Sequence, residues 1–189
     1  MTDVAHAFTV GQVRVQAVGH LNDVEPFGKG FALPRRIEAT CTGSELPYGV
    51  TLAIVLSNQK KLEVETLSAK RLPGGPSVTS EGIRKLPVAQ MVRAAALRHL
   101  LKVDGQARRP ARLSPAELPP ASVVAEGGTS DNALEWIALV YRLAHACGEG
   151  PTKAVMDAFG LSRATAGRRV DAARGAGYLG PATERRAGG

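Results

Sequence analysis

Three arginines lie close together in the stretch FGLSRATAGRRV, residues 159–170. Arg163 directly follows a Gly-Leu-Ser turn, and Arg168 and Arg169 come later in a run that favours a helix. A guanidinium group binds phosphate oxygens, and it can also bind O6 and N7 of guanine with two hydrogen bonds. Their spacing on one short helix therefore indicates a nucleic-acid partner.

Three helices are predicted to position these arginines within residues 131–180. Ser130 or Asp131 is a suitable N-cap for the first helix, and a Gly-Glu-Gly run at 148–150 ends it. Pro151 suits the first position of the second helix. Gly160 can end that helix with a positive φ, and Ser162 is a suitable N-cap for the third, residues 162–174.

The third helix is predicted to have one buried side and one basic side. Ala166, Val170 and Ala173 recur at positions i, i+4 and i+7, which marks the buried side. At about 100° per residue, Arg168 projects nearly opposite Ala166. Arg163 occupies the first turn, which is the part of a recognition helix that points at base edges.

The stretch VMDAFGLSRATAGRRVDAA, residues 155–173, resembles the helix-turn-helix of bacterial transcription regulators of the lac-repressor type. It also resembles the resolvase and invertase type, in which a Ser-Arg-Ala-Thr run opens the recognition helix. The resemblance covers about residues 131–180, and residues 1–102 resemble no family. The matching positions are Val155, Gly160, Leu161, Ser162, Thr165, Ala166, Val170 and Ala173.

This resemblance implies sequence-specific binding of double-stranded DNA, with the helix 162–174 in the major groove. The chain would then be a transcriptional regulator. Met156 and Arg169 depart from the usual pattern, and the second departure favours Arg169 as a flanking phosphate contact. The residues expected to contact DNA are Arg163, Thr165, Arg168, Arg169, Lys153, Ser162 and Arg174.

Charge placement supports the same interpretation. The 189-residue chain carries a net charge of +7, and the segment from Pro151 to Gly189 holds seven basic and three acidic residues, or +4. A basic tail, residues 181–189, ends it. Aromatic residues make up only 4 % of the chain, too few for the stacking platforms that bind single strands. A plain three-helix bundle with a solvated basic face remains the alternative, with Arg168 pairing with Asp171.

The chain offers no pattern typical of an enzyme. Two distant cysteines, Cys41 and Cys147, and four scattered histidines form no disulfide framework or zinc motif. No nucleophile–base set, phosphate loop or carboxylate pair stands out. We expect a protein that is not an enzyme and needs no cofactor or metal. Without a membrane span or a signal peptide, a cytoplasmic and nucleoid-associated location is expected.

Residues 1–102 are predicted to form an α+β domain. Alternating segments at 13–18, 37–42 and 62–67, and an apolar run at 50–56, indicate an antiparallel sheet with one solvated face. Residues 57–61 suit a hairpin between the last two strands. A short helix capped by Thr79 or Ser80 and a longer one over 87–101, with an apolar face for the sheet, follow.

Residues 103–130, rich in proline and arginine, are predicted to be a linker between this domain and the helical one. Within it, residues 107–112 could be a minor-groove arm or merely a basic linker. A homodimer formed through residues 1–102 is expected, because such modules usually bind two half-sites. Two alternatives remain: an assembly protein whose sheet binds a protein partner, and a DNA-recognition accessory of a phage or mobile element.

Overall fold

The computed structural model describes residues 6–10, 13–19, 23–43, 46–103, 111–112, 119 and 121–180. The chain divides into two compact units. The first comprises Met1–Leu118 and Leu143–Glu149, and the second comprises Pro119–Arg142 and Gly150–Gly189. Most strands occur in the N-terminal half and most helices in the C-terminal half, which confirms the predicted α+β class.

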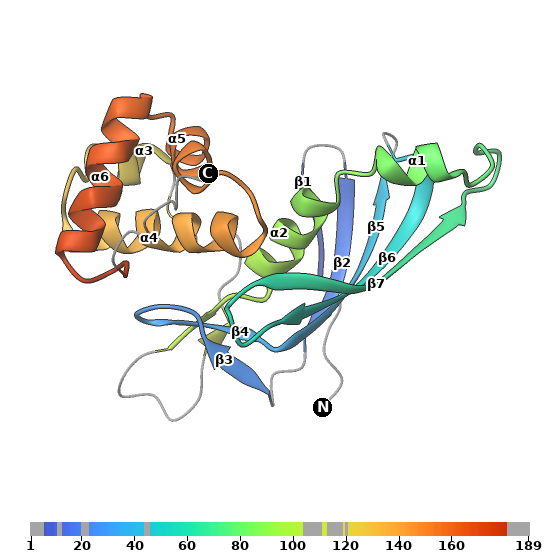
Figure 1. Ribbon diagram of the computed structural model, residues 1–189, viewed down its shortest axis with the longest axis horizontal. Helices are drawn as coiled ribbons and strands as arrows, with labels where there is room; N and C mark the ends of the chain where they lie inside the picture. The colour runs from blue at the N-terminus through green and yellow to red at the C-terminus, as the bar shows by residue number, and fades with distance from the viewer. Residues whose placement is uncertain are drawn as a thin grey trace, which may run out of the picture. The chain divides into compact units, whose positions relative to one another are not determined.

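A five-stranded antiparallel sheet forms the main layer of the first unit (Figure 1). Its strand order is β1-β2-β5-β6-β7, so β1 and β7 lie at the two edges. The strands are β1 (His6–Val10), β2 (Val13–Gly19), β5 (Arg36–Gly43), β6 (Tyr48–Leu56) and β7 (Leu62–Arg71). The four predicted strands are confirmed. β1 was not predicted.

The alternation of side chains explains why this sheet has one buried face. Ile37, Ala39 and Cys41 on β5 are at most 1 % exposed, while the intervening Glu38 and Thr40 are exposed. β6 alternates in the same way. The predicted hairpin connects β6 to β7, with the Ser57 N–H donating to the Lys61 carbonyl over 2.8 Å.

Two helices follow β7. In α1 (Ser80–Arg84), the Thr79 hydroxyl caps the N-terminus by accepting from the Gly82 N–H. In α2 (Val88–Arg98), the buried residues include Met91, Val92 and Ala95, as their helical spacing predicts. Pro87 lies at the N-cap of α2, not at its first helical position. The helix packs on strands β1, β2 and β5, and it thereby covers part of the apolar face of the sheet (Figure 1).

A second, smaller antiparallel sheet has the strand order β3-β4-β8-β9. Its strands are β3 (Val24–Pro26), β4 (Phe31–Pro34), β8 (Leu101–Lys102) and β9 (Ala111–Arg112), and none of them was predicted. On β3, the Glu25 carboxylate accepts from both Arg35 and Lys60, and Arg35 also pairs with Asp23 over 3.2 Å. These two cations lower the pKa of Glu25, Lys60 more strongly than Arg35.

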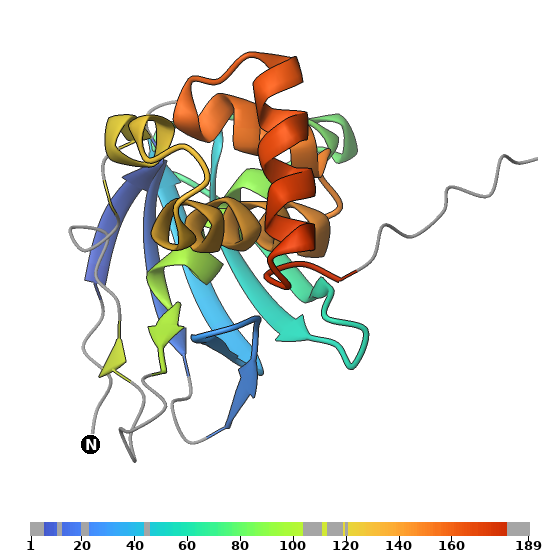
Figure 2. The same cartoon turned by 90° about the vertical axis from the view of Figure 1, so that its left-hand side faces the viewer.

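The second unit is helical. It contains α3 (Ala121–Glu126), most of α4 (Asp131–Ala146), α5 (Pro151–Phe159) and α6 (Arg163–Gly175). Figure 2 shows α6 in red running across α4, with α5 beside it. Buried residues from α4, α5 and α6 form its core, among them Ile137, Val155 and Ala166, each 0 % exposed.

The observed layout differs from the predicted domain boundaries in two places. Helix α3 occupies part of the stretch predicted as linker, and its Val124 is only 1 % exposed. The end of α4 and the turn after it, residues 143–149, are grouped with the first unit, where Arg93 Nη1 lies 2.6 Å from Glu149 Oε2. Residues 104–110 of the linker and the basic tail 181–189 lie outside the described residues.

Candidate nucleic-acid interface

A tight turn connects α5 to α6, as the sequence predicts. Pro151 occupies the start of α5, and Gly160 ends the helix in the left-handed region with φ 61° and ψ 30°. The N–H groups of Gly160 and Leu161 both reach the Met156 carbonyl. Ser162 then caps α6, and its hydroxyl accepts from the Thr165 N–H over 3.2 Å. Both caps act locally, and they fix where one helix ends and the next begins.

The buried side of α6 consists of the three predicted residues. Ala166 and Ala173 are 0 % exposed and Val170 is 2 % exposed. Small side chains at these positions let α6 approach the other helices of the unit closely. Tyr178 and Leu179, both 8 % exposed, turn back over the core after α6.

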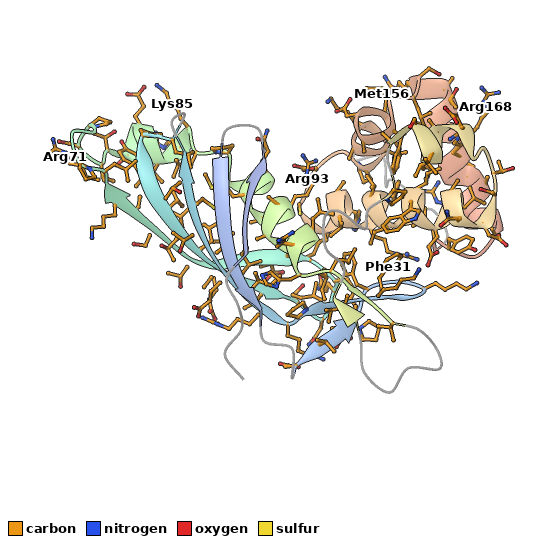
Figure 3. All side chains as sticks on the ribbon, turned by 180° about the vertical axis from the view of Figure 1, so that it is seen from behind. Phe31, Arg71, Lys85, Arg93, Met156 and Arg168 are labelled. Carbon is orange, nitrogen blue, oxygen red and sulfur yellow. The ribbon has the colours of Figure 1, made fainter. Side chains whose placement is uncertain are left out.

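Four of the predicted contact residues lie at the N-terminal half of α6. Ser162, Arg163 and Arg168 are exposed, and Thr165 is partly exposed. The Thr165 hydroxyl oxygen accepts from the Ser162 hydroxyl over 2.9 Å and from Arg168 Nη2 over 3.4 Å. The Ser162–Thr165–Arg168 chain forms a continuous polar edge along the first turns of the helix. Figure 3 shows Arg168 projecting from the surface of this helical unit.

The guanidinium groups of Arg163 and Arg168 are available for an anionic partner. Among the described residues, no carboxylate lies within 4.0 Å of either group. The alternative pairing of Arg168 with Asp171 does not occur, because Asp171 Oδ1 instead lies 2.9 Å from Arg174 Nη1. Apart from the 3.4 Å contact of Arg168 Nη2 with the Thr165 hydroxyl, the donors of these exposed guanidinium groups are left for phosphate or guanine.

Arg169 differs from the role predicted for it. Its guanidinium donates to the main-chain carbonyls of Val124 and Ala125, in the last turn of α3. Carbonyls at a helix C-terminus lack partners within the helix, so this arginine satisfies two of them. Arg169 therefore joins α6 to α3, and this use of its donors argues against its prediction as a flanking phosphate contact.

Arg174 also makes contacts within the unit. Besides Asp171, it donates to the Tyr141 hydroxyl over 2.9 Å, and its guanidinium carbon lies 5.2 Å from the centre of the Tyr141 ring. Its side chain is only 22 % exposed. These contacts hold the Arg174 side chain against α4, and its DNA contact stays a prediction.

Lys153 is the remaining predicted contact, and it lies on α5. Its ammonium pairs with Asp157 one turn along the same helix, and the lysine side chain is 74 % exposed. An exposed pair of this kind contributes little to stability, so the ammonium can exchange the carboxylate for a phosphate at small cost.

Arg142 was missed by the sequence analysis. It lies on α4 and donates to the Tyr178 carbonyl, which fixes the segment after α6 onto the core. Burial lowers the pKa of its guanidinium. Sequence alone gave no signal for this role, because an arginine on an amphipathic helix is usually solvated. Helix α3 did have a signal: the apolar pair in ASVVAE, between prolines and a Gly-Gly run.

Comparison with known proteins adds one match. Residues 103–186 match DUF6214, which is described as a family of unknown function. The match includes helices α3 to α6 and excludes the five-stranded sheet. No curated protein and no solved structure matches the chain.

Two further findings concern other kinds of site. Within the part of the chain that the structure describes, no group of three or more His, Cys, Asp or Glu side chains could hold a metal ion. None of the described helices combines the length and the apolar character that crossing a membrane requires.

Proposed function

We propose that the chain binds double-stranded DNA through the N-terminal half of α6, and that it acts as a transcriptional regulator. The observation that carries this proposal is the exposure of Arg163 in the first turn of α6 and of Arg168 on the side opposite Ala166, with no carboxylate partner for either among the described residues. The α5–turn–α6 geometry supports it, because this arrangement presents the start of the second helix to a major groove.

The two arginines are assigned to base contacts. Arg168 lies opposite Ala166, on the side that would face the groove. Arg163 lies in the first turn, at the end of the helix that would enter the groove. Guanine is the base that an arginine recognises best, through O6 and N7. Ser162 and Thr165 lie on the same edge and add hydroxyl groups for phosphate or base contacts.

Lys153 is assigned to a phosphate contact on the flank of the site. A phosphate contact contributes affinity without sequence preference and increases the dependence of binding on salt. The two kinds of contact can be told apart by measurement: loss of an arginine that contacts a base changes the sequence preference, and loss of a lysine that contacts a phosphate changes the salt dependence.

The experiment selects a preferred duplex from random DNA and then titrates variants on that duplex and on a scrambled one at several salt concentrations. Arg168→Ala should cost about 1–3 kcal/mol on the preferred duplex and relax the preference at one base pair. Lys153→Ala should weaken both duplexes alike and reduce the salt slope by about one. Arg84→Ala, which removes an exposed arginine of α1, is the matched control.

If folded Arg163→Ala and Arg168→Ala variants keep the affinity and the base preference of the wild type, α6 is not the recognition helix. Equal losses for these variants and Arg84→Ala would show general charge attraction without a specific site.

A further inference from the structure

β7 is an edge strand with one unoccupied side. It is ten residues long, and its neighbour in the sheet is β6 (Figure 1). Among the described residues, no backbone hydrogen bond joins the other side of β7 to another segment. The N–H and C=O groups on that side are free to pair with a further strand.

The apolar residues of β7 are incompletely covered. Val64, Leu67 and Ala69 are half-buried. Their partners on β6, Ile54, Leu52 and Val50, are each 0 % exposed. A strand added beside β7 would extend the buried face of the sheet by one row.

Charges are separated along β7. Glu63 and Glu65 lie in its first half, and Lys70 and Arg71 end it. Figure 3 shows Arg71 where the strand runs into the following turn. An identical strand placed antiparallel beside this one would bring its basic end next to the acidic end, and its acidic end next to the basic one. In a parallel arrangement, like charges would meet.

Glu63 and Lys70 lie on the same face of the sheet, as this antiparallel arrangement requires. Glu63 pairs with Val55 and Lys70 pairs with Gly49, and these β6 residues lie on the face opposite the buried one. Seven residues apart, Glu63 and Lys70 would normally point to opposite faces, but a register shift opposite Ala53 and Ile54 puts them on the same one. Residues that contact each other across an antiparallel pair must share a face.

Glu63 and Lys70 are not engaged by ion pairs among the described residues, whereas the other two charged residues of β7 have partners. Glu65 already pairs with Arg36 of β5, across β6, and Arg71 donates to the Gly75 carbonyl over 2.7 Å. In contrast, no cation among the described residues lies within 4.0 Å of the Glu63 carboxylate, and no carboxylate lies that close to Lys70. Their charges are the ones that a second strand would meet.

We infer that β7 pairs antiparallel with β7 of a second copy of this chain, about a two-fold axis near Leu67, and that Glu63 of each copy lies against Lys70 of the other. The interface joins the two five-stranded sheets into one ten-stranded sheet. It uses the same surface on both copies, as a two-fold dimer requires. This dimer does not depend on DNA binding and is measured without DNA.

The test uses the full chain in sedimentation equilibrium without DNA. The wild type should be a dimer at micromolar concentration. Glu63→Lys makes β7 almost wholly basic and Lys70→Glu makes it almost wholly acidic, so each variant alone should dimerise at least about tenfold more weakly. An equimolar mixture of the two should regain a dimer. Lys85→Glu, a charge reversal at the C-cap of α1, should leave the dimer intact.

Two outcomes would overturn the inference. One is a monomeric wild type; the other is a mixture that dimerises no better than either variant alone. Hydrogen exchange of the wild type gives a readout that needs no variant. Amides of residues 62–71 should become more protected as the protein concentration rises, and protection independent of concentration would exclude this edge as the interface.

Discussion

Arg169 on α6 donates through Nη1 to the carbonyl of Val124 on α3, over a distance of 2.9 Å. The second guanidinium nitrogen reaches the next carbonyl, that of Ala125. Arg169 and Val124 are 45 positions apart in the chain. One arginine therefore holds α3, which lies in the stretch predicted as linker, against the helix that carries the proposed DNA contacts.

Arg169→Ala should lower the free energy of unfolding of the helical unit by about 1–3 kcal/mol, because two carbonyls lose a charged donor. Arg169→Lys should restore only part of the loss, since one ammonium cannot reproduce the two-pronged guanidinium. Denaturant unfolding monitored by helical circular dichroism measures both. Arg163→Ala is the matched control and should be neutral, because that exposed side chain has no partner among the described residues. Equal stability of Arg169→Ala and wild type would show that α3 does not need this cap.

The ends of α5 and α6 and the turn between them could be predicted because their determinants are local. Gly160 ends α5 and Ser162 caps α6 through contacts within a few residues, and the spacing of Ala166, Val170 and Ala173 shows which side is buried. Such signals can be read from a short window of sequence.

The roles of the remaining arginines could not be predicted, because they depend on residues far away in the chain. Arg174 is 33 positions from Tyr141, and Arg142 is 36 positions from the Tyr178 carbonyl. Nothing within the helix distinguishes these arginines from the exposed Arg168. The strands of the small sheet were missed for a related reason: two to four residues are too few to show a period of two.

Glu25→Gln tests the cluster around β3 through its dependence on pH. Lys60 and Arg35 hold the pKa of Glu25 below its usual 4.5, so the folded state binds its proton less readily than the unfolded state. The carboxylate therefore stabilises the fold above pH 4.5, and this contribution disappears as the pH falls through the lowered pKa. Glu25→Gln should be less stable than wild type at neutral pH, and the two should converge in acid.

Urea unfolding at a series of pH values gives both curves. Glu38→Gln is the control, because Glu38 is exposed and its oxygen lies 3.7 Å from Arg36 Nε, too far for a strong hydrogen bond. A difference between Glu25→Gln and wild type that stays constant down to strong acid would contradict the assigned ion pairs.

Both cysteines should react slowly with thiol reagents while the protein is folded. Burial raises the pKa of the Cys41 thiol to about 11. Burial and Glu149 raise that of Cys147 to about 12, although Arg93 acts in the opposite direction. At pH 8 only about one thiol in a thousand would be ionised at the first of these values, and the thiolate is the reactive form. Labelling of native Cys41→Ala and Cys147→Ala proteins, compared with the same proteins in denaturant, isolates each thiol. Fast native labelling of Cys41 would show that the sheet opens locally at β5.

Gly160 and Gly167 provide a matched pair on the two sides of the turn. A Cβ added at either position would meet no neighbouring atom within 4 Å, so there is room for a side chain at both positions. Gly160 has a φ of +61°, a conformation that strains an L-residue, whereas Gly167 lies within α6 and has no positive φ. Gly160→Ala should therefore destabilise the helical unit by about 1–2 kcal/mol. Gly167→Ala should stabilise it by about 0.5–1 kcal/mol, because alanine loses less backbone entropy in a helix. Thermal and urea unfolding of the two variants measure these opposite signs. Equal destabilisation by both would mean that Gly167 is needed for packing that the described residues do not show.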